Sequence, residues 1–240
     1  MMHERSALLI GEAGIQTLAR SSMAVIGLGG VGSFVAEALA RSGVGTLYLL
    51  DADVVSTGNL NRQLVALHST IGHSKAEVAQ QRVLDISPTT TVHINTDFYT
   101  EGELFGGATV DLVFDCIDSL NPKLRLLRRL LDAGQPFISS MGAGGKLDPQ
   151  QVQIAKLSQT DICPLAARVR KFIRRTGHTL DFPVVYSREK PITPHTPLIS
   201  KTAHGRDRVA QGSMIFVPAT FGLSMASWGC RWLLSGGKTV

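Results

Sequence analysis

The first feature with clear chemical potential is a glycine-rich segment, GLGGVG, at residues 27–32. It follows a short apolar run and precedes a helix-compatible stretch, so its backbone amides and the helix dipole can hold a phosphate. Glycine allows both the tight turn and the close approach of a ligand to the backbone. The segment therefore predicts a phosphate-binding loop, whose glycines are Gly27, Gly29, Gly30 and Gly32.

An acidic residue follows at a spacing typical of nucleotide binding. Asp51 lies nineteen residues after Gly32, at the end of the next predicted strand, where its carboxylate can accept hydrogen bonds from ribose hydroxyls. The GxGxxG spacing is shared with dinucleotide-dependent dehydrogenases, so the loop alone leaves an NAD-dependent oxidoreductase open. A nucleotide-binding scaffold without catalytic activity is a further alternative.

Charged residues further along the chain favour a triphosphate over a diphosphate bridge. A triphosphate carries more negative charge, and its binding and transition state usually require Arg, Lys and a divalent metal. Arg62 and Lys75 supply the cations. The segment DCID at 115–118 ends the fourth predicted strand and offers carboxylates to a magnesium ion that bridges phosphates. These residues predict ATP and Mg²⁺ as ligands.

The first 140 residues alternate short apolar runs with longer helix-compatible stretches, the pattern of repeated βαβ units. Right-handed crossovers bring the carboxyl ends of such strands to one sheet edge, where ligands bind. We predict an α/β, Rossmann-like fold with a mostly parallel sheet and helices on both faces. The predicted strands are 24–26, 46–50, 91–95, 110–114 and 136–139, and the predicted helices are 30–41, 74–85 and 122–133.

The pattern changes near residue 148, which gives a soft boundary between a nucleotide-binding part (1–148) and a substrate-binding α+β extension (149–240) of one continuous fold. In the extension we predict a strand at 151–157. The proline-rich, polar segment 182–210 is predicted to be a long loop, mobile at about 188–210. A buried helix is predicted to start at Pro218, because a proline suits the first helical turn.

Composition narrows the class of protein. With 240 residues, 44% of them hydrophobic, the chain can form a self-sufficient core, and its 18% charged residues argue against global disorder. Its three cysteines include no CxxC pair, so neither a disulfide framework nor a zinc site is expected, and a cytoplasmic location fits best. No secretory signal or stable membrane insertion is expected. The net charge of +5 would not repel a polyanion.

A basic stretch at 161–176 could form a helix whose cationic face binds such a polyanion. Arg168, Lys171 and Arg175 recur at i, i+3 and i+7, and Arg170 and Arg174 stand beside them. Contacts from such a face to nucleic-acid phosphates would position a substrate rather than read its sequence. An ordinary solvated helix surface is the alternative.

Taken together, the motifs resemble the ubiquitin-activating-enzyme-like superfamily, which includes the molybdopterin and thiamine sulfur-carrier adenylases. The matching segments are GLGGVG, DAD at 51–53, NLNRQ at 59–63, GHSK at 72–75 and DCID. The resemblance implies that Asp118 holds magnesium and that Arg5 reaches across a homodimer, contacted through N-terminal helices, to the partner's ATP. It further implies nucleotide contacts by Asp51, Asp53, Asn59, Arg62, Gln63 and Lys75, of which Arg62 and Lys75 stabilise charge with Asp118 and Arg5.

Two later segments, MGAGGKLDP at 141–149 and DICPLA at 161–166, are similar to the tRNA threonylcarbamoyladenosine dehydratases. This implies ATP-dependent adenylation of the threonylcarbamoyl carboxylate on tRNA and then cyclodehydration, with sulfur-relay proteins as further possible partners. Sulfur-carrier adenylases commonly carry two zinc-binding CxxC pairs, and this chain has none. Adenylation of the C-terminus of a ubiquitin-like sulfur carrier stays open as the alternative.

Overall fold

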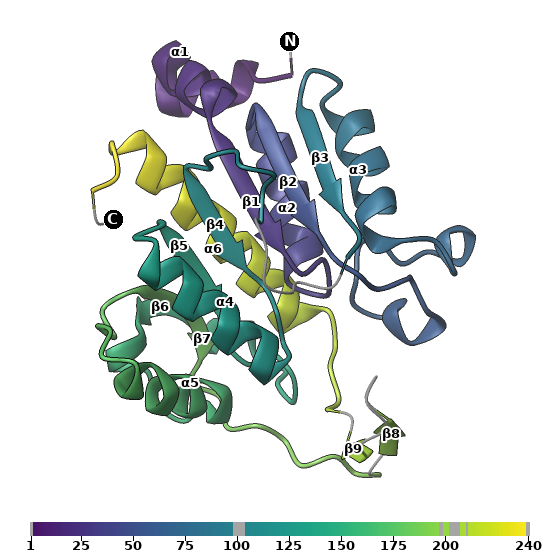
Figure 1. Cartoon of the computed structure of the whole chain (residues 1–240). Coiled ribbons are helices and arrows are strands. Elements are labelled where there is room, and N and C mark those ends of the chain that lie inside the picture. The colour runs from purple at the N-terminus through teal and green to yellow at the C-terminus, as the bar shows by residue number, and fades with distance from the viewer. Residues whose placement is uncertain (1, 98–103, 197–198, 202–206, 210, 239–240) are drawn as a thin grey trace.

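The fold is built on a seven-stranded sheet with the order β3-β2-β1-β4-β5-β7-β6 (Figure 1). It is described by a computed structural model for residues 2–97, 104–196, 199–201, 207–209 and 211–238. Neighbouring strands are parallel except β6, which is antiparallel to β7. The strands are β1 (Ser22–Ile26), β2 (Thr46–Leu50), β3 (Thr91–Asn95), β4 (Leu112–Asp115), β5 (Phe137–Ser140), β6 (Val152–Lys156) and β7 (Pro183–Ser187).

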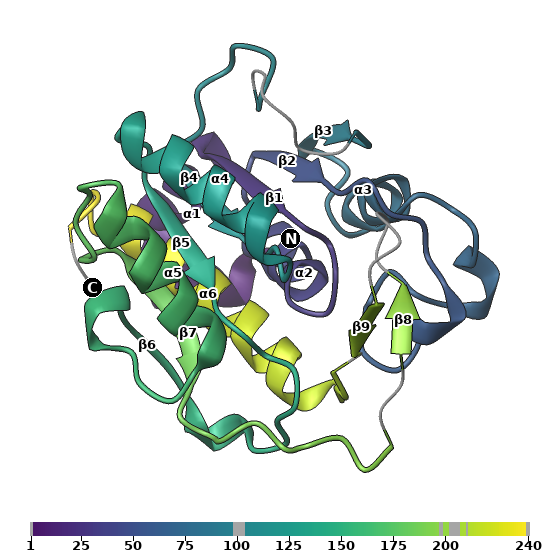
Figure 2. The same ribbon diagram turned by 60° about the horizontal axis from the view of Figure 1, so that its bottom comes forward.

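Helices cover both faces of this sheet, which confirms the predicted Rossmann-like α/β class (Figure 2). Helices α4 and α5 lie side by side on one face, and α2, α3 and α6 lie on the other. The helices are α1 (Glu4–Arg20), α2 (Gly32–Ser42), α3 (Lys75–Ile86), α4 (Leu120–Asp132), α5 (Pro164–Arg175) and α6 (Phe216–Leu234).

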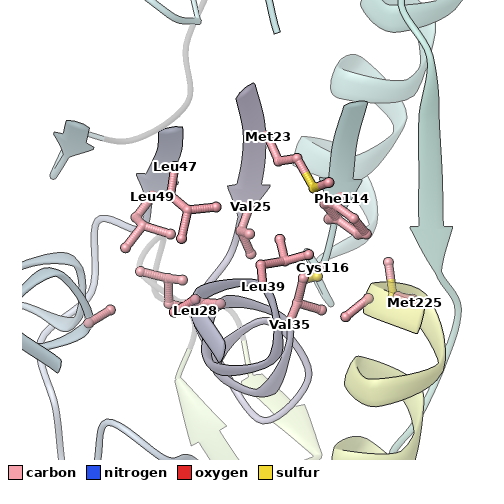
Figure 3. Close-up of a cluster of buried hydrophobic side chains, with 14 of the residues drawn as sticks. Met23, Val25, Leu28, Val35, Leu39, Leu47, Leu49, Phe114, Cys116 and Met225 are labelled. Carbon is pink, nitrogen blue, oxygen red and sulfur yellow. The ribbon is translucent and has the colours of Figure 1, made fainter. Parts of the chain in front are cut away.

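The central strands are apolar along their length because both of their faces are covered. Val25 of β1 points toward Leu39 of α2, and Met23 lies beside Phe114 of β4, in the core that also contains Met225 of α6 (Figure 3). Helix α6 can approach this closely only because glycine stands at the contact. A Cβ at Gly229 would lie 2.4 Å from the Phe114 ring. The C-terminal helix is therefore an integral layer of the nucleotide-binding fold.

The prediction of one long loop over 182–210 is wrong at its beginning. Pro183–Ser187 is the buried strand β7, between β5 and β6, and Val184 and Val185 are fully buried. A proline is tolerated as the first residue of a strand because it lacks only a donor there. The short apolar run of β7 is difficult to recognise in the sequence because a proline-rich segment follows it.

The remainder of the predicted mobile loop contains β8 (Ile199–Lys201) and β9 (Asp207–Val209), which form a separate two-stranded antiparallel sheet. The same prediction also covers residues 197–198, 202–206 and 210, which lie outside the described residues. The predicted buried helix is α6, which begins at Phe216 and has Pro218 in its first turn. Among the described residues, no helix combines the length and apolarity needed to cross a membrane.

Candidate nucleotide-binding site

The glycine-rich segment connects β1 to α2 at the carboxyl edge of the sheet, as predicted. Gly27 has a φ of 91°, a conformation that glycine adopts without strain. A Cβ at Gly32 would lie 1.7 Å from the Gly27 carbonyl oxygen, so the turn closes only with glycine at this position. At Gly30 a Cβ would lie 3.2 Å from Pro218 of α6. The loop is therefore a tight turn held between α2 and α6.

The amides of this turn are available to a ligand. The Ser33 amide donates to the Gly29 carbonyl, at 3.1 Å, and those of Phe34 and Val35 donate to Val31. Within the described chain, the amides of Gly29 and Gly30 donate no hydrogen bond to protein. Unpaired amides at the start of a helix form a binding site for phosphate. The geometry of the loop thus suits the role that its sequence predicts.

The carboxylate of Asp51 lies beside the glycine loop at the end of β2. Its two oxygens accept hydrogen bonds from the amides of Leu28, at 2.6 Å, and Asp53, at 2.9 Å. Burial raises the pKa of the Asp51 carboxyl above its ordinary value, while the charge of Lys75 and the two amides oppose that shift. The structure thus brings Asp51 to the loop, at the position expected for a ribose contact.

Lys75 and Asp53 form an ion pair at the same edge. The Lys75 amine is 2.8 Å from a carboxylate oxygen of Asp53, and its side chain is 6% exposed against 61% for Asp53. The lysine is the first residue of α3, whose preceding Ser74 caps the helix by accepting from the Glu77 amide. A phosphate close to the amine would therefore compete with Asp53 for Lys75, and the exposed aspartate can turn into water.

The NLNRQ segment lies against the glycine loop from the other side. The Arg62 side chain is 3.4 Å from the position of a Cβ at Gly30, and that of Gln63 is 3.7 Å from one at Gly29. A hydrogen bond of 3.2 Å from the Leu64 amide to the Ser33 hydroxyl ties the segment to α2. Chain positions more than thirty residues apart therefore meet at the loop, as the motif predicts.

The polar groups of this segment differ in how they are engaged. The Arg62 guanidinium donates to the Gly58 carbonyl, at 2.8 Å, and to the Asn61 side chain, at 2.9 Å, and forms no ion pair within the described residues. Asn59 accepts from the Ser56 amide at 3.1 Å and so caps a turn. The buried amide oxygen of Gln63 has no hydrogen-bond partner. Arg62 therefore holds a positive charge that no carboxylate of the described residues neutralises.

The two acids of the DCID segment have different environments. Asp115 is fully buried, 2.5 Å from the Lys123 amine, which is also fully buried, and it accepts from the Ser139 hydroxyl at 2.6 Å. Its other oxygen accepts from the Ile117 amide at 3.1 Å. Asp115 is therefore a structural group that shapes the turn after β4, as expected for a carboxylate that caps the end of a strand.

Replacing Lys123 by methionine should strongly destabilise the protein. The change leaves the Asp115 carboxylate buried without its cation, and removing one partner of a buried ion pair costs about 3–5 kcal/mol. The free energy of unfolding by urea measures the effect. The control is Lys156→Met, which removes a lysine from an exposed pair with Asp181 and should leave the stability nearly unchanged. Equal losses in both variants would contradict the structural role of Lys123.

Asp118, by contrast, is exposed at the carboxyl edge and accepts one hydrogen bond, from the Ser119 hydroxyl at 3.2 Å. Within the described ranges, no three His, Cys, Asp or Glu side chains gather as a ready-made metal site. Magnesium in nucleotide sites is commonly held by one or two carboxylates together with phosphate oxygens. An exposed carboxylate with no cationic partner in the described part of the chain fits that ligand set.

Arg5 lies at the opposite edge of the sheet from these residues. The residues before α1 contact the end of α2, since a Cβ at Gly43 would lie 2.9 Å from the His3 ring. The end of α1 contacts the start of β2 through a hydrogen bond of 3.1 Å from the Gly45 amide to Leu18. Figure 1 shows α1 beyond the amino ends of the strands. The structure does not bring Arg5 to the glycine loop of its own chain.

The predicted cationic helix face is found on α5, with one exception. Arg170 turns toward the protein, and its guanidinium donates to the Thr160 carbonyl at 2.9 Å and to the Thr160 hydroxyl. This arginine holds the preceding loop in place. The exposed cations of the helix are Arg168, Lys171, Arg174 and Arg175.

Two further groups of residues become apparent only in the structure. Arg125 and Arg128 are exposed on α4, which packs beside α5, so further exposed cations lie on the neighbouring helix. In the sequence, the sign of this pair is the spacing of three residues, which places both arginines on one face of a helix. Lys146, at the end of the GAGGK run, is buried and donates to the carbonyls of Gly142 and Ser187. Burial lowers the pKa of its amine.

A mostly parallel sheet with a glycine loop, a carboxylate beside it and cations at one edge is typical of nucleotide-binding α/β proteins of the Rossmann-like class. The chain belongs to the ThiF family, whose sequence profile matches residues 3–237. This confirms the resemblance that the motifs indicate.

Relatives and a solved structure match nearly the whole chain. The tRNA threonylcarbamoyladenosine dehydratase of Bacillus subtilis (strain 168) is 41% identical, over 94% of this chain and 92% of the relative. The enzyme of that name from Escherichia coli (strain K12) is 35% identical, over 92% and 89%. The crystal structure of the E. coli dehydratase TcdA in complex with ATP matches with a TM-score of 0.86 at 33% identity, covering 97% of this chain and 93% of that one.

Proposed function

We propose that this protein adenylates the carboxylate of a threonylcarbamoyl group on a tRNA adenosine, using ATP, and then closes that group into a ring. The observation that carries the proposal is Arg62, whose side chain passes the glycine loop at Gly30 and whose guanidinium has no carboxylate partner among the described residues. An arginine there matches the charge of a triphosphate. Similarity to dehydratases over 92–94% of the chain supports the choice of substrate.

The reaction needs two displacements. In the first, a carboxylate oxygen forms a bond to the α-phosphorus of ATP, and pyrophosphate leaves with the electrons of the broken P–O bond. In the second, a nucleophilic atom already on the substrate attacks the acyl carbon, and AMP leaves. The loop amides, Arg62 and Lys75 stabilise the negative charge that develops on the phosphates. No side chain forms a covalent bond with substrate, because the attacking group is intramolecular.

We include magnesium in the proposal because the Asp118 carboxylate and the phosphate oxygens of ATP are ligands that suit this ion. Asp118 would hold the ion together with phosphate oxygens, and the ion would neutralise charge on the leaving pyrophosphate. Asp118 is suited to this because it is exposed at the carboxyl edge and forms no ion pair within the described chain. Asp115 is unsuited because Lys123 and Ser139 already engage it.

The rival function, adenylation of a protein C-terminus, has weaker support. The ubiquitin-like modifier-activating enzyme 5 of Branchiostoma floridae is 33% identical over 58% of this chain, whereas the dehydratases match both halves. The deciding experiment incubates the protein with ATP and tRNA that carries threonylcarbamoyladenosine, followed by nucleoside analysis that preserves a labile cyclic product. We expect the cyclic nucleoside with equal amounts of AMP and pyrophosphate. ATP–pyrophosphate exchange stimulated by a ubiquitin-like carrier and not by tRNA would contradict the proposal.

The proposed active unit is a homodimer. Arg5 is exposed at the sheet edge remote from its own glycine loop, so it can serve an ATP site only in a second chain. Next to it on α1, Leu8 and Leu9 are 87% and 88% exposed, which is unusual for adjacent leucines on a helix. Burying such apolar side chains against a second copy would stabilise the dimer.

Mixing two inactive variants should restore activity if Arg5 acts in the partner's site. Arg5→Ala and Asp118→Ala should each be inactive in ATP turnover, whereas their heterodimer has one site with neither defect. Pyrophosphate release after subunit exchange measures the recovery, and exchange itself is followed with differently labelled chains. Proven exchange without recovery would place Arg5 outside any ATP site.

The exposed cations of α5 are proposed to bind tRNA phosphates, and a tRNA substrate is consistent with a cytoplasmic location. Arg168 lies near the start of α5, and this start contacts the carboxyl edge, since a Cβ at Gly142 would lie 3.5 Å from the Cys163 sulfur. The helix continues away from that edge by about 1.5 Å per residue to Arg175. The basic face therefore begins beside the nucleotide site. The end of a bound tRNA loop must reach this site for the reaction to occur.

A further inference from the structure

A pocket of about 420 Å³ opens at the carboxyl edge, beyond the end of β5. Three segments line it, at 145–147, 192–196 and 211–214. They meet at Gly145, whose amide donates to the Gly212 carbonyl at 2.7 Å and whose carbonyl accepts from the Ile192 amide at 2.7 Å. The volume lies in the range of sites for small organic ligands.

One wall of the pocket is held rigidly. The Glu189 carboxylate accepts from the amides of Leu147, at 3.0 Å, and Asp148, at 2.9 Å. The buried Lys146 amine donates to the Gly142 carbonyl at 3.0 Å and to the Ser187 carbonyl at 3.2 Å. These contacts place the peptide units of the wall before any ligand arrives, and a preformed wall lowers the entropy lost on binding.

The pocket shares a side with the phosphate loop. The Asn61 side chain donates to the Ser213 carbonyl, at 2.8 Å, and accepts from Arg62, which contacts Gly30. Asp51 follows β2, whereas the pocket follows β5, and β1 and β4 stand between these two strands. If the ribose lies at Asp51, most of the ATP molecule lies away from the pocket. Only the phosphates then approach the pocket. The pocket is open to the second substrate.

The chemistry of the lining suits a heterocyclic base with a short polar side chain. Leu147, Ile192 and Met214 line it and are 48%, 45% and 47% exposed, so apolar surface is available to the faces of a ring. Gln211 and His195 add hydrogen-bonding groups for ring edges. Enzymes that modify a base commonly take it out of its stack into such a pocket.

We infer that this pocket binds the modified adenine base of the substrate nucleotide, turned out of the tRNA loop. The pocket thereby directs the carboxylate of the threonylcarbamoyl group past Asn61 to the α-phosphorus of ATP. The inference rests on the proposed function and names the residues that would recognise its substrate. A protein C-terminal tail in the pocket is the competing occupant.

Gly212 offers a way to fill the pocket without disturbing the fold. A Cβ at Gly212 meets no atom within 4 Å, and its φ lies outside the left-handed region. Gly212→Phe should therefore occupy the pocket, and Gly212→Ala controls for the change of backbone freedom. The probes are two anticodon stem-loops, one with threonylcarbamoyladenosine and one with adenosine at the same position. ATP affinity is measured alongside.

We expect the wild type to prefer the modified stem-loop by on the order of tenfold to a hundredfold, the effect of one stacked and hydrogen-bonded base. Gly212→Ala, the smaller change at the same position, should lose less of this preference than Gly212→Phe. Gly212→Phe should lose this preference and tRNA-dependent pyrophosphate release, with unchanged affinity for ATP and for the unmodified stem-loop. If Gly212→Phe kept both the preference and the modification rate, the pocket assignment would be overturned while the proposed function stood. A wild type that converts no tRNA but activates a carrier protein would overturn both.

Discussion

Replacing Arg62 by alanine is expected to lower the rate of pyrophosphate release by about 10²–10³-fold, which is typical for loss of one preorganised charge at a transition state. The Arg62 side chain passes the glycine loop at Gly30, and its guanidinium is held by the Gly58 carbonyl and Asn61, neither of which neutralises it. It therefore meets the charge that develops on the phosphates with little rearrangement. The affinity for ATP should fall by much less than the rate.

The measurement is single-turnover pyrophosphate release at saturating ATP, with the dissociation constant for ATP determined separately. Arg62→Lys tests the geometry, because lysine keeps the charge but loses the planar fork that Asn61 and the carbonyl orient. Arg41→Ala is the matched control, since that arginine pairs with Glu37 on the surface, away from the carboxyl edge. If only the ATP affinity changed in Arg62→Ala, Arg62 would be a ground-state binder and its catalytic assignment wrong.

The second large effect is expected on tRNA. Replacing Arg168, Lys171 and Arg175 together by glutamine should reduce the dependence of log affinity on log salt by about one unit for each lost phosphate contact. ATP affinity should hardly change, because these side chains are exposed on α5 and none contacts the glycine loop. The triple variant would therefore bind ATP normally and fail to modify tRNA at physiological salt.

Salt titrations of tRNA binding for each single variant separate local contacts from the effect of net charge. Arg41→Gln makes the same change of charge on α2, which covers the opposite face of the sheet, and should leave the slope unaltered. Arg125→Gln on α4 tests whether the basic surface extends beyond α5. A triple variant with the wild-type slope would make the α5 face an ordinary solvated surface.

Local patterns sufficed to predict the nucleotide half of the protein. The glycine loop, its acid and the strands around them follow one another closely in the chain, and their roles depend on backbone geometry that glycine and strand ends dictate. The turn between β1 and α2 and the position of Asp51 beside it agree with those expectations. Family membership also follows from the sequence, because the motifs occur together and in order.

Contacts between distant segments decided the rest. In the sequence, Asp115 and Asp118 are two carboxylates near the end of the same strand. Only the structure shows that Asp115 pairs with Lys123, whereas Asp118 is exposed. Helical periodicity places Arg170 near the basic face, but the Thr160 carbonyl turns it inward.

The pocket at Gly145 is likewise assembled from three segments up to about seventy residues apart. No local pattern marks it, because each segment contributes ordinary backbone and a few side chains. The strand β7 belongs with these cases: Pro183–Ser187 resembles a loop by composition and becomes a strand because β5 and β6 leave hydrogen-bonding edges on both sides of it. The sequence by itself thus determined the chemistry of the phosphate loop. The tertiary structure decided which charges remain free to act, because burial and pairing depend on the residues that folding brings near.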